Sequence, residues 1–118
     1  MAPSKHRTSV KPRMTDKEMN HIAGTVNVLV HQSGLTLDTA VEQLCNAGNI
    51  SKEELLGHRR YEPLVTWRQG FYYVCRTGLK MTWTSIAAQG NWHHATVMYG
   101  SNKIKDYVAT LPSRAMQS

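Results

Sequence analysis

Residues 81–105 read MTWTSIAAQGNWHHATVMYGSNKIK, and this pattern predicts two helices joined by a short turn. Thr82 is suited to cap a first helix over residues 83–89, because its hydroxyl can accept a hydrogen bond from an amide of the first turn. We expect Gly90 to end that helix in a left-handed conformation, and Asn91 to cap a second helix that begins at Trp92. The apolar positions expected to face a core are Ile86, Ala87, Val97 and Ile104. The stretch therefore has the pattern of a helix-turn-helix.

The start of the second helix carries side chains suited to contact with DNA. A recognition helix places its N-terminal residues against base edges in the major groove, where small and polar side chains fit. The side chains expected in that position are Trp92, His93, His94, Ala95 and Thr96. Thr84 in the first helix and Lys103 in the second complete the surface predicted for this motif.

The chain has 118 residues and a formal net charge of +6, and its charges are unevenly distributed. Residues 15–58 contain six acids and two bases, whereas residues 59–105 contain seven bases and a single acid, Glu62. Clustered positive charge provides the salt-sensitive, sequence-independent part of nucleic-acid affinity. No apolar run approaches the ~20 residues that span a bilayer, and no basic helix has a large apolar face. The partner we expect is nucleic acid and not a membrane.

Further basic residues precede the helix-turn-helix: Arg59, Arg60, Arg68, Arg76 and Lys80. The first two fall in a predicted loop between helices. Because residues four apart share a helix face, Arg68, Tyr72 and Arg76 predict an exposed ladder that can follow a phosphate backbone. An ordinary solvated stripe is the alternative.

An N-terminal helix is predicted by the capping box Thr15-Asp-Lys-Glu18, in which the two end residues exchange hydrogen bonds. The apolar stripe of this helix recurs at steps of three and four and consists of Met19, Ile22, Ala23, Val26, Leu29 and Val30. It can pack on its own domain, or it can pair with a second copy or a partner protein. The sequence leaves both interpretations open.

Three more helices are expected between this one and the helix-turn-helix. Asp38 is predicted to cap the first, and a capping box from Ser51 to Glu54 begins the second. Glu62-Pro63 opens the third, since a proline costs little in a first turn. The predicted buried face of this third helix is Leu64, Trp67, Phe71, Val74 and Cys75.

These elements predict an all-α fold of about five to six helices around one modest core. We expect residues 1–14 to form a basic flexible arm, 15–34 the N-terminal amphipathic helix, 35–110 the helix-turn-helix domain and 111–118 a disordered tail. Cys45 and Cys75 fall at apolar helix positions, which favours buried free thiols. Adjacent helical residues such as His93 and His94 point about 100° apart and do not readily chelate one ion, so neither a metal nor a cofactor is expected.

Residues 35–108 resemble the C-terminal DNA-binding domain, domain IV, of the bacterial replication initiator DnaA. The matching landmarks run in the same order: Ser51-Lys-Glu-Glu-Leu-Leu56, Arg59-Arg60, Arg68-Gln69, Ile86, His94-Ala-Thr-Val97 and Lys103-Ile104. The region is also similar to the Trp repressor of the same superfamily, through Gly100-Ser-Asn-Lys-Ile-Lys105. The DnaA resemblance implies that Arg60, beside Arg59, enters the minor groove and that Arg68, Gln69 and Arg76 face DNA or its phosphates.

The chain also departs from both families. The DnaA family usually presents Asp-His-Thr-Thr where residues 93–96 are His-His-Ala-Thr, so we expect a different target sequence. Trp92 replaces a usually basic residue, so one phosphate contact is lost or replaced by apolar packing. The two arginines that hold the corepressor in the Trp repressor correspond to Gln69 and Tyr99, which argues against tryptophan sensing. The sequence contains no Gly-x-x-x-x-Gly-Lys-[Ser/Thr] phosphate loop for an ATPase.

We therefore expect a non-enzymatic protein of the bacterial cytoplasm or nucleoid that binds specific sequences of double-stranded DNA. As a stand-alone factor, for example of a phage, it would act in transcription regulation or in control of replication initiation. The alternative is an interaction protein that binds the replication machinery through residues 15–30, the helix that also offers a surface for a homodimer.

Overall fold

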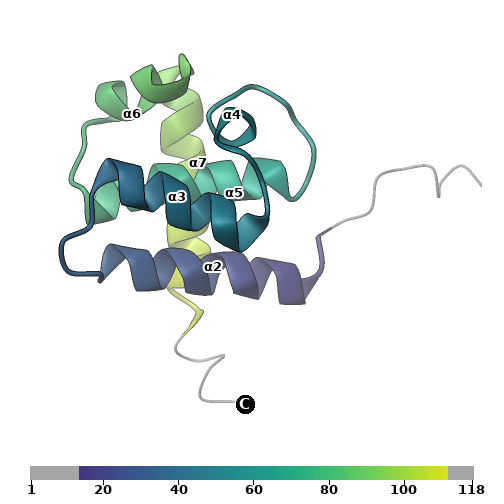
Figure 1. The fold of residues 1–118 in the computed structure, drawn as a ribbon. Helices are drawn as coiled ribbons and strands as arrows, with labels where there is room; N and C mark the ends of the chain where they lie inside the picture. Colours follow the sequence, from purple (N-terminus) through teal and green to yellow (C-terminus); the bar gives the residue numbers. More distant parts are fainter. Residues whose placement is uncertain (1–13, 112–118) are drawn as a thin grey trace, which may run out of the picture.

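A computed structural model describes residues 14–111, and the regular structure within them is helical (Figure 1). The elements are α2 (Asp16–Val30), α3 (Leu37–Gly48), α4 (Lys52–Leu55), α5 (Leu64–Tyr73), η1 (Val74–Gly78), α6 (Trp83–Gly90) and α7 (His94–Val108). The all-α prediction is confirmed. The predicted arm up to residue 13, and the predicted tail from residue 112, lie outside the described residues. Between residues 14 and 111, no helix is long and apolar enough to cross a membrane.

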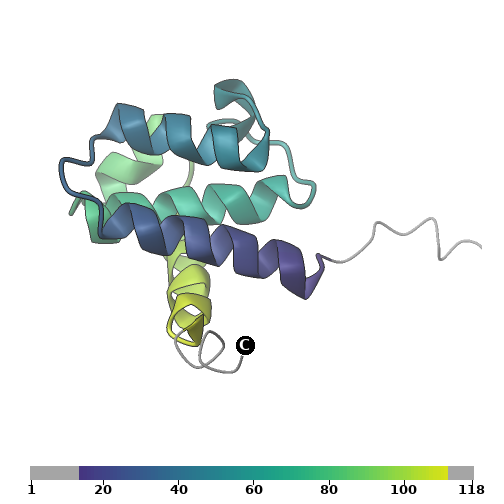
Figure 2. The same cartoon turned by 60° about the horizontal axis from the view of Figure 1, so that its bottom comes forward.

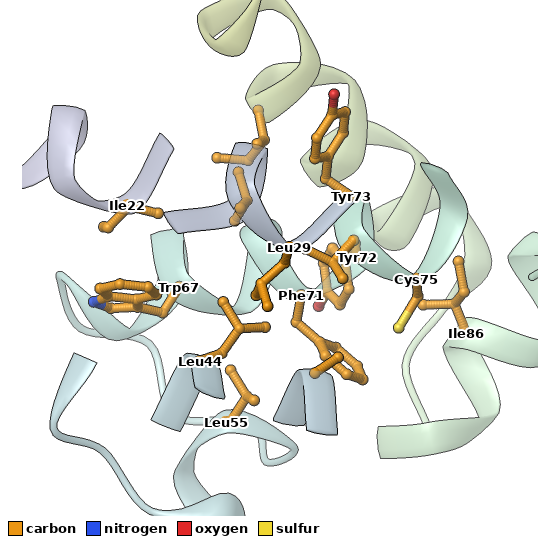
Figure 3. Close-up of a cluster of buried hydrophobic side chains, with 14 of the residues drawn as sticks. Ile22, Leu29, Leu44, Leu55, Trp67, Phe71, Tyr72, Tyr73, Cys75 and Ile86 are labelled. Atoms are coloured by element: carbon orange, nitrogen blue, oxygen red, sulfur yellow. The ribbon is translucent and has the colours of Figure 1, made fainter. Parts of the chain in front are cut away.

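Helix α5 is the central helix of the fold. It contacts α2, α3, α4 and α7, and it continues into η1, a π-helical turn. Figures 1 and 2 show α2, α3 and α5 running alongside one another while α7 crosses them. Leu29, Leu44, Leu55 and Phe71 converge around α5 and are each 1% exposed or less (Figure 3). The same core cluster includes Ile86 of α6 and Val97 of α7, so one continuous core joins the N-terminal helices to the helix-turn-helix.

Helix α2 begins at the predicted capping box. The Thr15 hydroxyl oxygen accepts from the Glu18 amide at 3.0 Å, and the Glu18 carboxylate accepts from the Thr15 amide at 3.0 Å. The helix packs against α3, α5 and α7 and buries Ile22, Ala23, Val26 and Leu29. Its apolar stripe is thus used within this chain, which is the first of the two interpretations that the sequence left open.

The prediction that Asp38 caps α3 is wrong. Thr36 Oγ1 accepts from the Thr39 amide at 3.1 Å, and Thr39 Oγ1 accepts from the Thr36 amide at 3.0 Å. Asp38 lies in the first turn, where a carboxylate interacts favourably with the positive end of the helix dipole. The next cap was predicted correctly, since Ser51 Oγ accepts from the Glu54 amide at 3.0 Å to begin α4.

Helix α5 begins at Leu64, and Pro63 is its N-cap residue, so the proline lies just before the first turn in which it was predicted. The Glu62 carboxylate accepts from the amide and the hydroxyl of Thr66, at 3.2 and 2.8 Å. The predicted buried face is confirmed, with each of its members 2% exposed or less. Cys75 on this face is a free thiol, and burial raises its pKa to about 12, whereas the free thiol of Cys45 is only half-buried.

Helices α5 and α7 approach each other closely at Gly100. A Cβ there would lie 2.8 Å from Gln69 Cγ and 2.9 Å from Tyr72 Cδ2, so alanine forces the helices apart. We expect Gly100→Ala to lower the free energy of unfolding by about 1–3 kcal/mol, measured by urea denaturation. Gly24→Ala on α2 is the control, because a Cβ there meets no atom within 4 Å and alanine is the better helix former. Equal stability of the two variants would contradict this packing.

Candidate nucleic-acid interface

The turn between α6 and α7 differs from the predicted one. Thr82 caps α6 as expected, with the Ser85 amide donating to Thr82 Oγ1 at 3.0 Å. The left-handed residue is not Gly90 but Asn91, with φ 56° and ψ 46°. Gly90 ends α6, and a Cβ there would lie 2.3 Å from the ring of Trp92. Glycine is required for the close approach of this ring and not for a positive φ.

Helix α7 begins at His94 and not at Trp92. Its N-cap is His93 and not Asn91, because the His93 ring Nδ1 accepts from the Ala95 amide at 3.1 Å. A nitrogen that accepts carries no hydrogen, which fixes the tautomer of the neutral ring. The rings of His93 and His94 stack with centroids 5.0 Å apart and planes 19° from parallel. The cap therefore orients both imidazoles at the tip of α7.

The first turn of α7 forms an accessible polar surface that contains most of the predicted residues. These exposed residues are His93, His94, Ala95 and Thr96. Tyr99 is 69% exposed, and its three-residue spacing from Thr96 places it on the same helix face. Lys103, four residues farther on, is also exposed. Tyr99 was absent from the predicted DNA-facing set, although helical spacing alone indicates its position.

Trp92 lies against the protein and not on the exposed surface where the sequence placed it. Its ring makes edge-to-face contacts with Phe71 and Tyr72, with centroids 6.1 and 5.0 Å apart. The indole Nε1 donates to the Gly57 carbonyl at 2.9 Å. A large aromatic ring is stabilised by burial when its single N–H finds an acceptor, and both conditions are met here. Trp92 therefore packs against aromatic side chains, which is one of the two outcomes expected for this residue.

The loop between α4 and α5, residues 56–63, presents Arg59 and Arg60 to solvent and is called the arginine loop below. Figure 1 shows this loop at the same end of the molecule as α6 and the start of α7. His58 links the two regions, because its Nε2 lies 2.7 Å from the Gly90 carbonyl oxygen. A carbonyl can only accept, so this nitrogen carries the hydrogen. His58 was not predicted as part of the site, and its position beside the arginine pair is the only sequence signal for it.

Arg68 is buried, so the predicted exposed ladder of Arg68, Tyr72 and Arg76 is wrong. Arg68 is 5% exposed and Tyr72 is 3% exposed. The Arg68 guanidinium donates to the carbonyls of Leu55, Arg59 and Glu54 at 2.9, 2.8 and 2.6 Å. The central position of α5 explains the error, because most faces of this helix pack on neighbours. Arg68 organises the loop from inside the protein.

Burial changes the acid–base properties of this region. It lowers the pKa of the Arg68 guanidinium and raises the pKa of Tyr72 to about 12. At the α4 end of the loop, the Tyr61 hydroxyl donates to Glu54 Oε2 at 2.6 Å. This hydrogen bond is the main cause that lowers the pKa of the Glu54 carboxyl and raises the pKa of Tyr61.

Arg76 and Lys80 lie past the C-terminal end of α5, and both are exposed. The Arg76 guanidinium stacks on the Trp83 ring, 4.3 Å from its centroid, and donates to the Met81 carbonyl at 3.1 Å. Lys80 Nζ donates to the Thr77 carbonyl at 3.0 Å. Thr84 of α6 is exposed as predicted. These residues flank the start of α6.

A cleft of about 350 Å³ separates the arginine loop from α7. Its lining residues are His58, Arg60, Val65, Arg68, Gln69, Tyr72, Asn91, Trp92, His93, Thr96 and Tyr99. This set joins Arg60, Arg68 and two histidines, and it contains no acid. Gln69 Oε1 is buried and has no hydrogen-bond partner within residues 14–111. The cleft therefore suits an anionic partner that also carries hydrogen-bond donors.

Comparisons with known proteins identify a family for this chain. Residues 37–104 match the family described as "Bacterial dnaA protein helix-turn-helix". The chromosomal replication initiator protein DnaA of Oenococcus oeni is 33% identical over 86 residues, 70% of this chain and 18% of that protein. The DnaA of Cutibacterium acnes is 32% identical over 75 residues, 63% of this chain and 15% of that protein. No solved structure matches the chain significantly.

The family match extends from the start of α3 to Ile104 in α7. It therefore includes the arginine loop, the central helix and the helix-turn-helix, while the chain spans less than a fifth of the length of these relatives. On this evidence, the chain belongs to the bacterial DnaA helix-turn-helix family of DNA-binding domains.

Proposed function

We propose that this protein binds specific sequences of double-stranded DNA with two elements. The first turn of α7 enters the major groove, where His93, His94, Ala95 and Thr96 contact base edges. Arg60, with Arg59 beside it, enters the adjacent minor groove, where a narrow groove concentrates negative potential. The observation that carries the proposal is the exposure of both elements at one end of the molecule, around a cleft with no acidic lining residue.

Phosphate contacts complete the proposed interface. The exposed side chains of Arg76, Lys80 and Lys103 provide positive charge for the phosphates but do not distinguish one base from another. Gln69 lines the cleft, and Thr84 lies near the start of α6. Arg68 has a different proposed role, which is to hold the loop that carries the arginine pair. Tyr99 joins the set because of its exposure beside Thr96.

The proposed biological role is transcription regulation or control of replication initiation. The relatives are named as chromosomal replication initiators, and a protein that shares their helix-turn-helix can compete for related sites. The changed residues His93 and Ala95 favour a target that differs from that of the relatives. ATP hydrolysis is not proposed for these 118 residues, which lack a phosphate-loop motif. The protein-partner alternative loses support because the stripe of α2 is buried within the chain.

The general test is selection of bound duplexes from a random pool at two salt concentrations. A conserved set of bases at both concentrations, with affinity falling steeply as salt rises, is the expected result. The symmetry of the selected sequence also reports whether one or two copies bind. If the bound duplexes share no common bases at either salt concentration, sequence-specific binding is rejected.

The roles of α7 residues can be separated with a matched pair of variants. His94→Ala is expected to weaken the selected duplex by about 1–3 kcal/mol and to relax preference at one or two base pairs. Lys103→Ala, on the same helix, is expected to weaken all duplexes alike and to reduce the salt slope by about 1. Fluorescence-anisotropy titrations with the selected and scrambled duplexes measure both effects. Equal losses of the two variants on the two duplexes would contradict the groove assignment.

A further inference from the structure

We propose that Trp92 is a positioning residue that, together with His58, fixes the separation between the arginine loop and the tip of α7. This inference rests on the proposed function, since it concerns how two DNA-contacting elements are held together. The inference goes beyond the proposed function because it assigns a role in specificity to two side chains that form hydrogen bonds within the protein. The consequence is that the minor-groove and major-groove contacts fall at one set distance along the duplex.

Two hydrogen bonds join the loop to the helix-turn-helix turn in opposite directions. Trp92 Nε1 donates across to the Gly57 carbonyl at 2.9 Å, and His58 Nε2 donates back to the Gly90 carbonyl at 2.7 Å. Each segment thus provides one ring donor and one backbone acceptor. Two such bonds restrict rotation as well as translation of one segment against the other.

The two segments also approach each other closely at Gly90. A Cβ on Gly90 would lie 2.3 Å from Trp92 Cζ2 and 2.6 Å from the Leu56 carbonyl oxygen. On its other side the Trp92 ring meets Phe71 and Tyr72 of α5. The ring therefore contacts the turn, the loop and the central helix, while it remains partly exposed at the cleft.

The same loop is anchored a second time just before Arg60. The Arg68 guanidinium donates a hydrogen bond to the Arg59 carbonyl at 2.8 Å. Trp92 donates to the Gly57 carbonyl, two residues earlier. Backbone anchors on both sides of His58 define the direction in which the exposed Arg60 side chain leaves the protein. Such preorganisation reduces the conformational entropy lost when the arginine enters a groove.

A double-mutant cycle tests whether Trp92 acts through Arg60. Trp92→Phe retains an aromatic ring but removes the N–H donor. We expect it to weaken the selected duplex about 5- to 10-fold and to erase base preference on the side contacted by the loop, with preference at the α7 side retained. In an Arg60→Ala background, the same substitution is expected to change affinity less than about twofold. Losses that multiply independently in the two backgrounds would overturn the positioning role.

A second pair of variants tests the link from the other side. His58→Phe removes the donor to Gly90 and is expected to reproduce the loss of loop-side preference. His58→Gln keeps a side-chain N–H near the position of Nε2 and is expected to restore that preference. If His58→Phe and His58→Gln behave alike, the hydrogen bond does not position the loop and the inference is wrong.

Trp83→Phe is the matched control, since Trp83 lies on α6 and its ring contacts Arg76. It is expected to leave the loop-side base preference unchanged. Circular dichroism verifies that each variant is folded before binding is measured. A wild-type protein that selects no duplex sequence would reject the proposed function itself, whereas intact selection with an additive cycle rejects only the role of Trp92.

Discussion

Arg68→Met is expected to lower the free energy of unfolding by about 3 kcal/mol, because three buried or partly buried carbonyls lose their donor. Methionine approximates the aliphatic stem of arginine but provides neither N–H groups nor charge. The carbonyls of Glu54, Leu55 and Arg59 would then need water or new partners. Urea denaturation followed by circular dichroism measures the loss. DNA affinity is expected to fall too, because the loop that presents Arg60 is no longer held.

Arg76→Met is the control for this prediction. Arg76 is exposed, and its stacking on Trp83 and single hydrogen bond lie at the surface. Its replacement is expected to cost less than about 1 kcal/mol of stability, while still flattening the salt dependence of DNA binding. If Arg68→Met were as stable as Arg76→Met, the guanidinium could not be an internal support of the loop.

Leu29→Ala is expected to lower the free energy of unfolding by about 2–5 kcal/mol, because it leaves a cavity in a closely packed core. Leu29 is 1% exposed and belongs to the same core cluster as Leu44 and Phe71. The substitution lowers the stability of the whole domain but does not alter the DNA-contacting surface. DNA affinity, measured at a temperature where the variant is folded, should therefore change little. Thermal or urea unfolding, together with anisotropy below the transition, measures the two quantities.

Val28→Ala is the neighbouring control, since Val28 is 65% exposed on the same helix. Its expected change in stability lies within about 0.5 kcal/mol. A small effect of both substitutions would mean that α2 is not part of the core, and the interpretation of residues 15–30 as a surface for another protein would regain support. A large effect of Leu29→Ala alone is the outcome that the packing of α2 requires.

Sequence alone was sufficient for several features that depend on neighbours in the chain. The caps at Thr15, Ser51 and Thr82, the buried face of α5 and the exposed residues 93–96 follow from short-range hydrogen bonding and helical periodicity. The cap of α3 shows the limit of such local rules. Thr36 and Asp38 are both good capping residues, and only the reciprocal bond with Thr39 favours the first.

The tertiary structure decided what three side chains of the interface do. Arg68 and Trp92 were both predicted to face DNA. Instead, Arg68 donates hydrogen bonds to three carbonyls, and the ring of Trp92 lies beside Gly90. Their acceptors are 9 to 35 residues away in sequence, and His58 likewise bonds a carbonyl 32 residues away. Periodicity identifies a buried stripe, because burial of apolar area depends on side-chain type. It does not identify which distant carbonyl a long polar side chain reaches, because that depends on how the helices cross.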